Sequence, residues 1–365
     1  MSDTVLYGAT GYTGRLVAAE LKRLGSDFAL AGRSIERLRR LSGELQVDVP
    51  LHAAPVGDPP ALRRAFEGAR CVINCAGPFT KIGKSVVEAA VETHTNYIDT
   101  TGEQQYIKSV FDTYSERAAQ ARVAVICAMG FDIVPADMGA QLAAAGLGRL
   151  DELTVAYSLE HMMATHGTVL SLMQVMGGSG LVYECSKFCQ APSVPRRRRV
   201  HFPDSLGKQM CISFPAGEIV TIPRHVDVED LAVSIASKTV APSHWLEGAL
   251  PWLVPAASLA LRTPLRALLQ RAVTRLPKGP SEEQRKAATF QIVIEAKGTQ
   301  GKRRGVISGS DVYGLTAISC AHAAQLIVDP SFNRSGVLAP AQAFEPESFL
   351  NYLGNWGLKV DRDWF

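Results

Sequence analysis

The chain lacks any large excess of charge. Its 365 residues carry 38 Lys and Arg side chains against 35 Asp and Glu, for a net charge of +3. This balance argues against a nucleic-acid partner, which requires a strongly basic surface. The one basic cluster, Arg196 to Arg199, falls in a proline- and arginine-rich stretch, residues 191–203. We expect an exposed loop there, with an anionic partner such as a carrier protein or a phosphate group as the alternative.

Long hydrophobic runs are also missing. The most apolar segment, residues 246–261, is interrupted by Pro251 and Pro255 and falls short of the roughly 20 residues that a membrane-spanning helix needs. We expect a buried or interface helix, and a peripheral membrane contact is the alternative. No signal peptide precedes the first predicted strand, so the expected location is cytoplasmic.

Cysteine pairs with a disulfide or metal spacing are absent. The chain has seven cysteines, an odd number, and Cys71, Cys75 and Cys127 lie in apolar runs, as buried reduced thiols do. Cys185 and Cys189 have no second pair and no nearby histidine ligands. We therefore predict no metal site.

The N-terminal segment is the most informative stretch that is present. Residues 4–7 are typical of a buried strand, and a helical pattern begins at Leu16, directly after three glycines spaced three apart. Such a strand, turn and helix direct backbone N–H groups and the positive end of a helix dipole at one point, where a phosphate can bind. Gly8 permits the sharp turn, Gly11 a close approach of the pyrophosphate, and Gly14 close packing of helix and strand. The candidate cofactor-binding residues here are Gly8, Thr10, Gly11, Tyr12, Thr13 and Gly14.

The second predicted strand, residues 28–32, has no acidic residue at its end. NAD-binding domains place Asp or Glu there to bind the ribose hydroxyls, whereas this strand is followed by Arg33 and Ser34. The planar, permanently charged guanidinium of Arg33 suits a 2′-phosphate, and Ser34 adds a hydroxyl and can cap the next helix. The pattern favours NADP(H), unless Arg33 is simply a surface arginine.

Strands and helices alternate about six times through residue 138, which indicates a doubly wound parallel sheet of the Rossmann type. Ligands in such folds bind beyond the carboxyl ends of the strands. We therefore expect Ala76, Gly77 and Pro78 along the cofactor and Phe79 on the nicotinamide side.

Residues 139–314 follow a different pattern. Strand-like runs at 153–159, 218–223, 231–236 and 289–296 are separated by longer loops. We predict an inserted α+β substrate-binding domain with a mainly antiparallel sheet. A helix is expected to begin near Gly167. Residues 315–365, with an apolar helix at 314–328, are expected to complete the Rossmann domain.

Hydride transfer requires a proton donor within hydrogen-bond reach of the substrate. Among the acids near predicted strand ends, Asp132 is the preferred functional residue, while Asp99, Glu103 and Asp137 have structural interpretations. In the second domain the candidates, each with a structural alternative, are the catalytic residues His166 and Tyr157, the neighbouring His161, and the substrate contact Thr168.

Five motifs together resemble saccharopine dehydrogenase-like oxidoreductases, with trans-acting enoyl reductases as the most similar branch that we can name. They begin at Gly8, Ala31, Asn74, Tyr97 and Gly130, and their sequences are GATGYTG, AGRS, NCAGPF, YIDTTGE and GFDIVPAD. The resemblance implies a Rossmann domain completed by the C-terminal segment, an inserted substrate domain, and NADP(H) bound at their cleft. It also implies that Asp132 and Thr101 line the substrate pocket.

The expected activity is NADPH-dependent reduction of an activated double bond, the C=C of an enoyl substrate of acyl or polyketide type. The substrate would be a small molecule or a carrier-bound acyl group, and a homodimer is expected. Two alternatives stay open: a C=N or C=O oxidoreductase of the saccharopine reductase kind, acting on an amino-acid-like substrate, and a non-catalytic NADP-binding scaffold or peripheral protein.

Overall fold

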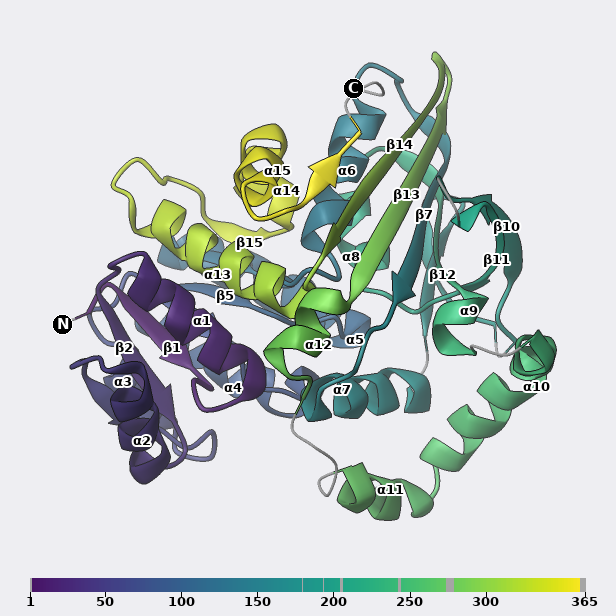
Figure 1. The fold of residues 1–365 in the computed structure, drawn as a ribbon. Helices are drawn as coiled ribbons and strands as arrows, with labels where there is room; N and C mark the ends of the chain where they lie inside the picture. The colour runs from purple at the N-terminus through teal and green to yellow at the C-terminus, as the bar shows by residue number, and fades with distance from the viewer. Residues whose placement is uncertain are drawn as a thin grey trace. The chain divides into compact units, whose positions relative to one another are not determined.

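The computed structural model describes residues 2–178, 180–192, 194–203, 206–241, 244–273 and 279–361 (Figure 1). The chain divides into two compact units. The first unit is Met1–Gly102, Tyr106–Val134 and Tyr313–Phe344. The second unit is Glu103–Gln105, Pro135–Val312 and Glu345–Phe365.

The first unit is built on a seven-stranded sheet whose strands are all parallel, in the order β15-β6-β5-β4-β1-β2-β3. Every residue of β1, β2 and β4 is buried, as expected when helices cover both faces of a parallel sheet. The strand order reverses between β1 and β4, which creates the switch point where this fold class binds ligands. The strands are β1 (Thr4–Tyr7), β2 (Phe28–Gly32), β3 (Leu51–Ala53), β4 (Cys71–Asn74), β5 (Asn96–Asp99), β6 (Ala124–Ile126) and β15 (Gly336–Leu338).

Local sequence signals explain where the helices of this unit begin. The side chain of Ser34 accepts the backbone N–H of Arg37 at 3.3 Å and caps α2, and Asp58 accepts that of Ala61 at 2.9 Å and caps α3. Pro59 follows Asp58 at the first helical position, where its missing N–H costs nothing. The helices are α1 (Tyr12–Arg23), α2 (Ile35–Leu45), α3 (Pro59–Phe66), α4 (Phe79–Glu92), α5 (Gln104–Ala121), α13 (Val312–Val328) and α14 (Pro340–Ala343).

The second unit is built on a nine-stranded mixed sheet with the path β10-β11-β12-β7-β13-β14-β16, extended by β8 and β9. Only β12 and β7 pair in parallel along the described strands, so the predicted mainly antiparallel sheet is confirmed. The strands are β7 (Leu150–Glu160), β8 (Leu181–Glu184), β9 (Lys187–Gln190), β10 (Arg197–His201), β11 (Lys208–Ser213), β12 (Val228–Ala236), β13 (Thr289–Gly298), β14 (Gly301–Ser310) and β16 (Lys359–Val360).

The helices of the second unit include the predicted one near Gly167, which begins at His166. They are α6 (Val134–Ala144), α7 (His166–Gly177), α8 (Glu218–Thr221), the 3-10 helix Ile222–Arg224, α9 (Ser237–Val240), α10 (His244–Leu261), α11 (Leu265–Val273), α12 (Glu282–Ala287) and α15 (Pro346–Gly354). Within the described ranges, no helix is both long and apolar enough to cross a membrane.

Two predictions about local structure are wrong. Residues 218–223 form α8 and the start of the 3-10 helix, not a strand. The run from Glu218 to Ile222 is buried throughout, and a short run buried on all sides carries no periodicity that separates helix from strand. Within the predicted loop 191–203, Arg197–His201 is β10, an edge strand whose charged side chains discourage pairing with another sheet.

The C-terminal segment differs in part from its predicted place. Strand β15 joins the parallel sheet next to β6, as a segment completing the Rossmann domain would. Strand β16, however, pairs with β14 through Ile307 with Val360 and Ser308 with Lys359, so Glu345–Phe365 groups with the second unit. Residues 362–365 lie outside the described part.

Candidate functional site

The glycine turn after β1 is packed so tightly that side chains cannot be added. Gly8 has φ +77°, and a Cβ placed on it would lie 2.7 Å from the backbone nitrogen of Ala76. A Cβ on Gly14 would lie 2.4 Å from the carbonyl oxygen of Gly8. The Gly8 N–H donates to the carbonyl of Ala31 at 3.0 Å. The turn is therefore held against both neighbouring strands, β2 and β4.

Helix α1 begins directly from this turn. Gly11 occupies its N-cap position and is exposed, and the first turn contains no acidic residue. The N–H groups of this turn can therefore donate hydrogen bonds to a bound anion, which the positive end of the helix dipole also favours. Tyr12 packs edge-on against Tyr313 of α13, with ring centroids 5.3 Å apart. Thr10 and Thr13 are half-buried beside it.

Arg33 and Ser34 lie at the carboxyl end of β2, where sequence placed them. Arg33 is exposed, and its positive charge partly offsets the effect of burial, which raises the pKa of Tyr7 on β1 to about 12. The Ser34 hydroxyl donates to the Glu36 carboxylate at 2.7 Å, and this bond holds the pKa of Glu36 below its usual range. The hydrogen bond between Ser34 and Glu36 was not predicted from the sequence.

At the end of β4, Asn74 shapes the next turn. Its Oδ1 accepts the Ala76 N–H at 2.9 Å, and its Nδ2 donates to the Tyr97 hydroxyl at 2.9 Å. Gly77 is exposed, Pro78 is the N-cap of α4, and the buried Phe79 packs on Tyr106. The predicted cofactor residues after β1, β2 and β4 thus share the carboxyl edge of one sheet.

Asp99, to which the sequence analysis gives a structural interpretation, is the centre of a buried polar network. Its Oδ1 accepts the N–H groups of Thr101 at 3.1 Å and Ala128 at 2.9 Å, and its Oδ2 accepts the Tyr97 hydroxyl at 2.9 Å. Burial outweighs these hydrogen bonds and raises the pKa of Asp99 to about 6. The network ties the ends of β4, β5 and β6 together, which is a positioning role, and it holds the buried Thr101 in place.

Asp132 fits into a space left by two glycines. Its Oδ2 lies 2.3 Å from where a Cβ on Gly102 would be, and its Oδ1 lies 2.4 Å from the same position on Gly130. The surrounding protein, together with the charge of Asp99, raises the pKa of Asp132 to about 6. Its side chain is nevertheless exposed, so contact with water moderates this shift.

The neighbouring backbone is also anchored. The Phe131 N–H donates to the Thr316 hydroxyl of α13 at 3.0 Å. Asp132 is therefore a solvent-accessible carboxyl on a fixed loop, with a pKa raised above its usual range, as suits a proton-transfer group.

The other predicted catalytic residues belong to the second unit. Tyr157 is buried on β7, and its hydroxyl donates to the buried carboxylate of Glu218. His166 is the half-buried first residue of α7, and the exposed His161 lies before it. The Thr168 hydroxyl lies 2.9 Å from that of Thr165, the N-cap of this helix. The catalytic and substrate roles of Tyr157, His166 and Thr168 stay predictions.

The acids given structural interpretations have structural partners. Asp137 lies 3.0 Å from the Nε2 of His225, with both side chains buried, and Glu103 accepts the Ser171 hydroxyl at 2.7 Å. Gln104, which sequence reasoning overlooked, bonds through its amide to the backbone of Leu181 and Ala216. In the basic cluster, Arg196 and Arg198 pair with Glu184 and Glu152, so two of its four charges are already balanced.

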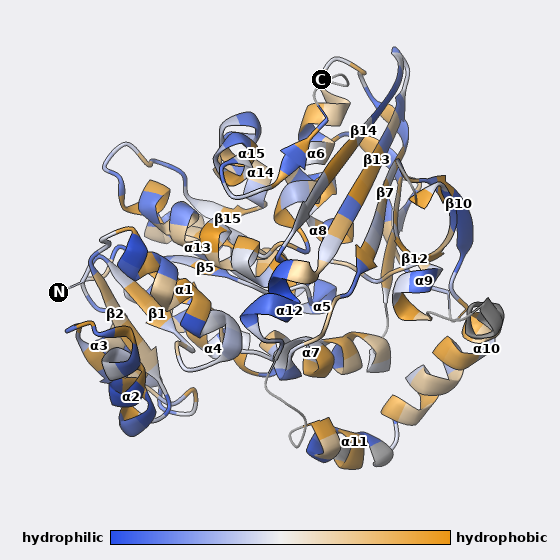
Figure 2. Ribbon diagram, viewed as in Figure 1, coloured by the Kyte–Doolittle hydropathy of each residue, from blue (hydrophilic) through white to orange (hydrophobic). Residues whose placement is uncertain are grey.

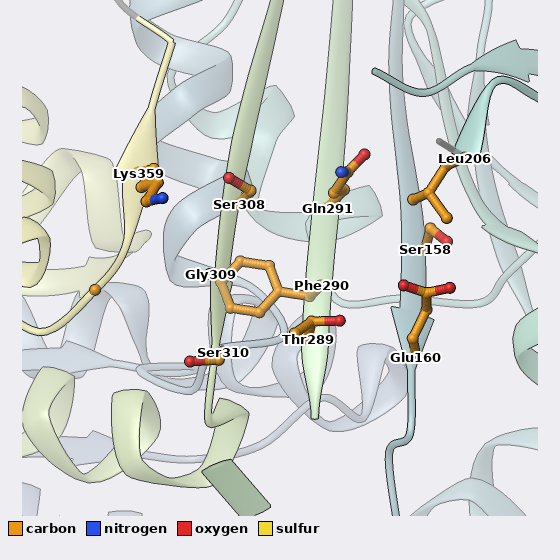
Figure 3. A pocket seen from close by; sticks show the side chains of 11 residues that line it. Ser158, Glu160, Leu206, Thr289, Phe290, Gln291, Ser308, Gly309, Ser310 and Lys359 are labelled. Atoms are coloured by element: carbon orange, nitrogen blue, oxygen red, sulfur yellow. The ribbon is translucent and has the colours of Figure 1, made fainter. Parts of the chain in front are cut away.

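A pocket of about 380 Å³ lies on one face of the second unit's sheet (Figure 3). Ser158, Gln291, Ser308 and Lys359 line it in a row, since each is paired with the next across β7, β13, β14 and β16. None of the predicted site residues lines this pocket. Over the described ranges, no group of three or more metal-ligating side chains comes together.

Comparisons with known proteins agree with this geometry. Residues 4–129 match the saccharopine dehydrogenase NADP binding domain. A putative trans-acting enoyl reductase of Mycobacterium tuberculosis is 28% identical over 388 aligned positions, covering 93% of each chain. A trans-acting enoyl reductase of Mycobacterium ulcerans is 31% identical over 226 positions, covering 59% of this chain and 54% of the relative.

Among solved structures, the apo saccharopine dehydrogenase (L-Glu forming) of Saccharomyces cerevisiae superposes with a TM-score of 0.60 at 12% identity, covering 99% of both chains. At this identity the match establishes the fold. The sequence-based resemblance is confirmed: residues 4–129 match the saccharopine dehydrogenase NADP binding domain, and a relative named as a putative trans-acting enoyl reductase is similar along most of the chain.

Proposed function

We propose that this protein is an NADPH-dependent reductase of an activated C=C bond, with an enoyl thioester of acyl or polyketide type as its substrate. The observation that carries the proposal is the glycine turn at the carboxyl edge of the parallel sheet, with Arg33 beside it. Similarity to trans-acting enoyl reductases along 93% of the chain supports the substrate class.

The residues present fit a dinucleotide phosphate. The Cβ-free surfaces of Gly8 and Gly14 let the turn close tightly, and Gly11 leaves the start of α1 open to a pyrophosphate. Arg33 supplies a charged fork for a 2′-phosphate. Glu36 would have to turn away from Ser34 for that hydroxyl to contribute, and as an exposed side chain it is free of packing that would prevent this. NADPH, when bound, supplies a hydride from its nicotinamide ring.

Asp132 is the residue that we propose for proton transfer. When a hydride adds to the β carbon of an enoyl thioester, the π pair moves to the α carbon and the thioester oxygen, and the α carbon then takes a proton. With a pKa of about 6, Asp132 is protonated in roughly one molecule in ten at pH 7 and can be recharged from water, because it is exposed. Thr101, held by Asp99, is the proposed substrate contact beside it.

The experiment measures NADPH oxidation with crotonyl and longer enoyl thioesters, a ketone and an imine in parallel. We expect turnover of the thioesters. Turnover of the imine or ketone alone would instead support the C=N or C=O oxidoreductase suggested by the family of the NADP-binding domain. Tight NADPH binding with no turnover of any substrate would support a non-catalytic protein.

The cofactor assignment has its own test. Replacing Arg33 by Ala should weaken NADPH binding about tenfold to a hundredfold, because a charged hydrogen-bonded pair is lost, and should change NADH binding little. Arg64→Ala is the matched control, an exposed arginine on α3. Equal losses for both cofactors would refute the 2′-phosphate assignment. The homodimer and a carrier-bound substrate are further proposals, which light scattering and a carrier-linked enoyl substrate test directly.

A further inference from the structure

Four buried polar side chains of the first unit lie behind the turn that follows β4. They are Asn74 on β4, Tyr97 and Asp99 on β5, and Tyr106 on α5, and each is at most 3% exposed. Strands of a parallel sheet that helices cover are normally apolar, as Figure 2 shows for β2. Polar groups in such an interior are costly unless they are hydrogen-bonded. We call these four side chains the polar cluster.

The hydrogen bonds of the polar cluster can run in one direction only. The Oδ1 atom of Asn74 accepts the Ala76 N–H at 2.9 Å, so the Nδ2 group of the same amide faces the Tyr97 hydroxyl and donates to it at 2.9 Å. The Tyr97 hydroxyl donates in turn to Oδ2 of Asp99 at 2.9 Å. Because Tyr97 has a single hydroxyl hydrogen, the Tyr106 hydroxyl at 3.0 Å must donate to it.

The carboxylate of Asp99 fixes this direction. An ionised carboxylate only accepts hydrogen bonds, and Oδ1 of Asp99 already accepts the backbone N–H groups of Thr101 and Ala128. A continuous chain of hydrogen bonds therefore runs from the Ala76 N–H through Asn74 and Tyr97 to Asp99. In the low dielectric of the interior each bond of such a chain polarises the next, so the loss of one bond weakens the others.

The turn at residues 76–79 contacts the polar cluster at both of its ends. At one end is the Ala76 N–H, whose nitrogen lies 2.7 Å from where a Cβ on Gly8 would be, so this backbone has no room to shift toward the glycine turn. At the other end the ring of Phe79 packs on the ring of Tyr106, with centroids 5.7 Å apart. The polar cluster therefore determines where this turn lies.

We propose that the polar cluster positions the nicotinamide half of the cofactor, with Tyr97 as its central residue. The inference rests on the proposed placement of residues 76–79 along the nicotinamide side of NADP(H). Arg33, the proposed contact of the 2′-phosphate, follows β2, and β1 separates β2 from β4 in the sheet. A change in the polar cluster should therefore affect the nicotinamide half and leave the 2′-phosphate half in place.

Tyr97→Phe removes one oxygen atom and keeps the ring. The Nδ2 group of Asn74 then loses its acceptor, so the amide can turn and release the Ala76 N–H. Asp99 loses a donor and Tyr106 loses an acceptor in the same step. We expect NADPH to bind about tenfold more weakly. Adenosine 2′,5′-bisphosphate, which lacks the nicotinamide half, should bind within about twofold of its affinity for the unmodified protein.

The test is calorimetric titration of both ligands into the intact chain at pH 8, where Asp99, with a pKa raised by burial to about 6, is ionised. Tyr114→Phe is the matched control, because Tyr114 is another buried tyrosine of α5 and its hydroxyl donates to Glu88 of α4 at 2.7 Å. The control should lose stability and bind both ligands as the unmodified protein does. Both readouts are binding constants, so a lack of enoyl thioester turnover would refute the proposed reaction without changing this result.

Two outcomes would overturn the proposal. One is an unchanged affinity of Tyr97→Phe for NADPH, and the other is an equal loss of affinity for both ligands, which would assign the polar cluster to the stability of the sheet alone. A Tyr97→Phe variant that lacks the circular dichroism spectrum of the folded protein is replaced by Asp99→Asn. There the oxygen of the new amide would accept the two backbone N–H groups, so its NH₂ group would face the Tyr97 hydroxyl as a second donor. The same selective loss of NADPH affinity is expected, and the same two outcomes would overturn the proposal.

Discussion

The glycine turn allows a prediction in which conformational strain and close packing can be separated. Gly8 and Gly25 both have positive φ, +77° and +64°, and both flank α1. A Cβ on Gly8 would meet the backbone nitrogen and the Cβ of Ala76 at 2.7 and 2.9 Å, whereas a Cβ on Gly25 would meet nothing within 4 Å. Replacing each by alanine thus imposes a similar backbone strain, and only Gly8→Ala adds overlap with the turn that follows β4.

The magnitudes follow from these two terms. A left-handed alanine costs about 1–2 kcal/mol at either position. Overlap with a fixed backbone adds about 1–3 kcal/mol, so Gly8→Ala should lower the free energy of unfolding by about 2–5 kcal/mol in total. Because the overlap pushes the glycine turn away from the turn that follows β4, we also expect Gly8→Ala to weaken NADPH binding at least about tenfold, which is about 1.4 kcal/mol. Gly25→Ala should leave NADPH binding within about twofold.

The assays are urea unfolding followed by far-ultraviolet circular dichroism and NADPH titration by calorimetry. Circular dichroism is preferred to tryptophan fluorescence, since all four Trp residues, at positions 245, 252, 356 and 364, belong to the second unit. If Gly8→Ala binds NADPH as the unmodified protein does and loses no more stability than Gly25→Ala, the close packing of the turn is not what the cofactor requires, and our reasoning fails.

Four further predictions concern buried or titratable groups. If Asp132 donates the proton, kcat/KM for the thioester should fall as pH rises through about 6, because only the protonated carboxyl can donate. Asp132→Asn should abolish this fall. An unchanged pH profile in the variant would exclude Asp132 as the proton donor. Burial raises the pKa of Asp99 in the folded state to about 6, so the folded state holds more protons than the unfolded state between about pH 4 and 6. The free energy of unfolding should therefore fall as pH rises through that window. Asp99→Asn should flatten this dependence, which melting curves at fixed pH values measure. Tyr157→Phe should lower the melting temperature, because Glu218 loses its buried donor, and a hundredfold loss of kcat at unchanged stability would point to a catalytic Tyr157 instead. Gln104→Ala should cost about 1–3 kcal/mol of stability, since its amide satisfies buried backbone groups, and urea unfolding compared with that of Gln105→Ala, an exposed neighbour, measures the difference.

Much of the first unit could be predicted because its signals are local. The strand at residues 28–32 has the predicted bounds, and the next helix is capped by Ser34 as predicted. Buried parallel strands are short apolar runs that end in turn residues, and Ser34 caps its helix with its own side chain. The second unit was harder to predict, because its strands pair with distant partners and β10, β11 and β14 carry mixed polar sequences.

The sequence by itself determined the glycine turn, the missing acid after β2 and the alternation that makes a parallel sheet, because each depends on residues close together in the chain. Only the tertiary structure decided that β16 pairs with β14, that Asp99 collects donors from β5 and from Ala128 beyond β6, and that Asp132 occupies the space of two absent side chains, at Gly102 and Gly130. These contacts join residues up to about fifty positions apart, and burial sets their energies and pKa values. No pattern of neighbouring residues in the sequence shows how deeply these groups are buried.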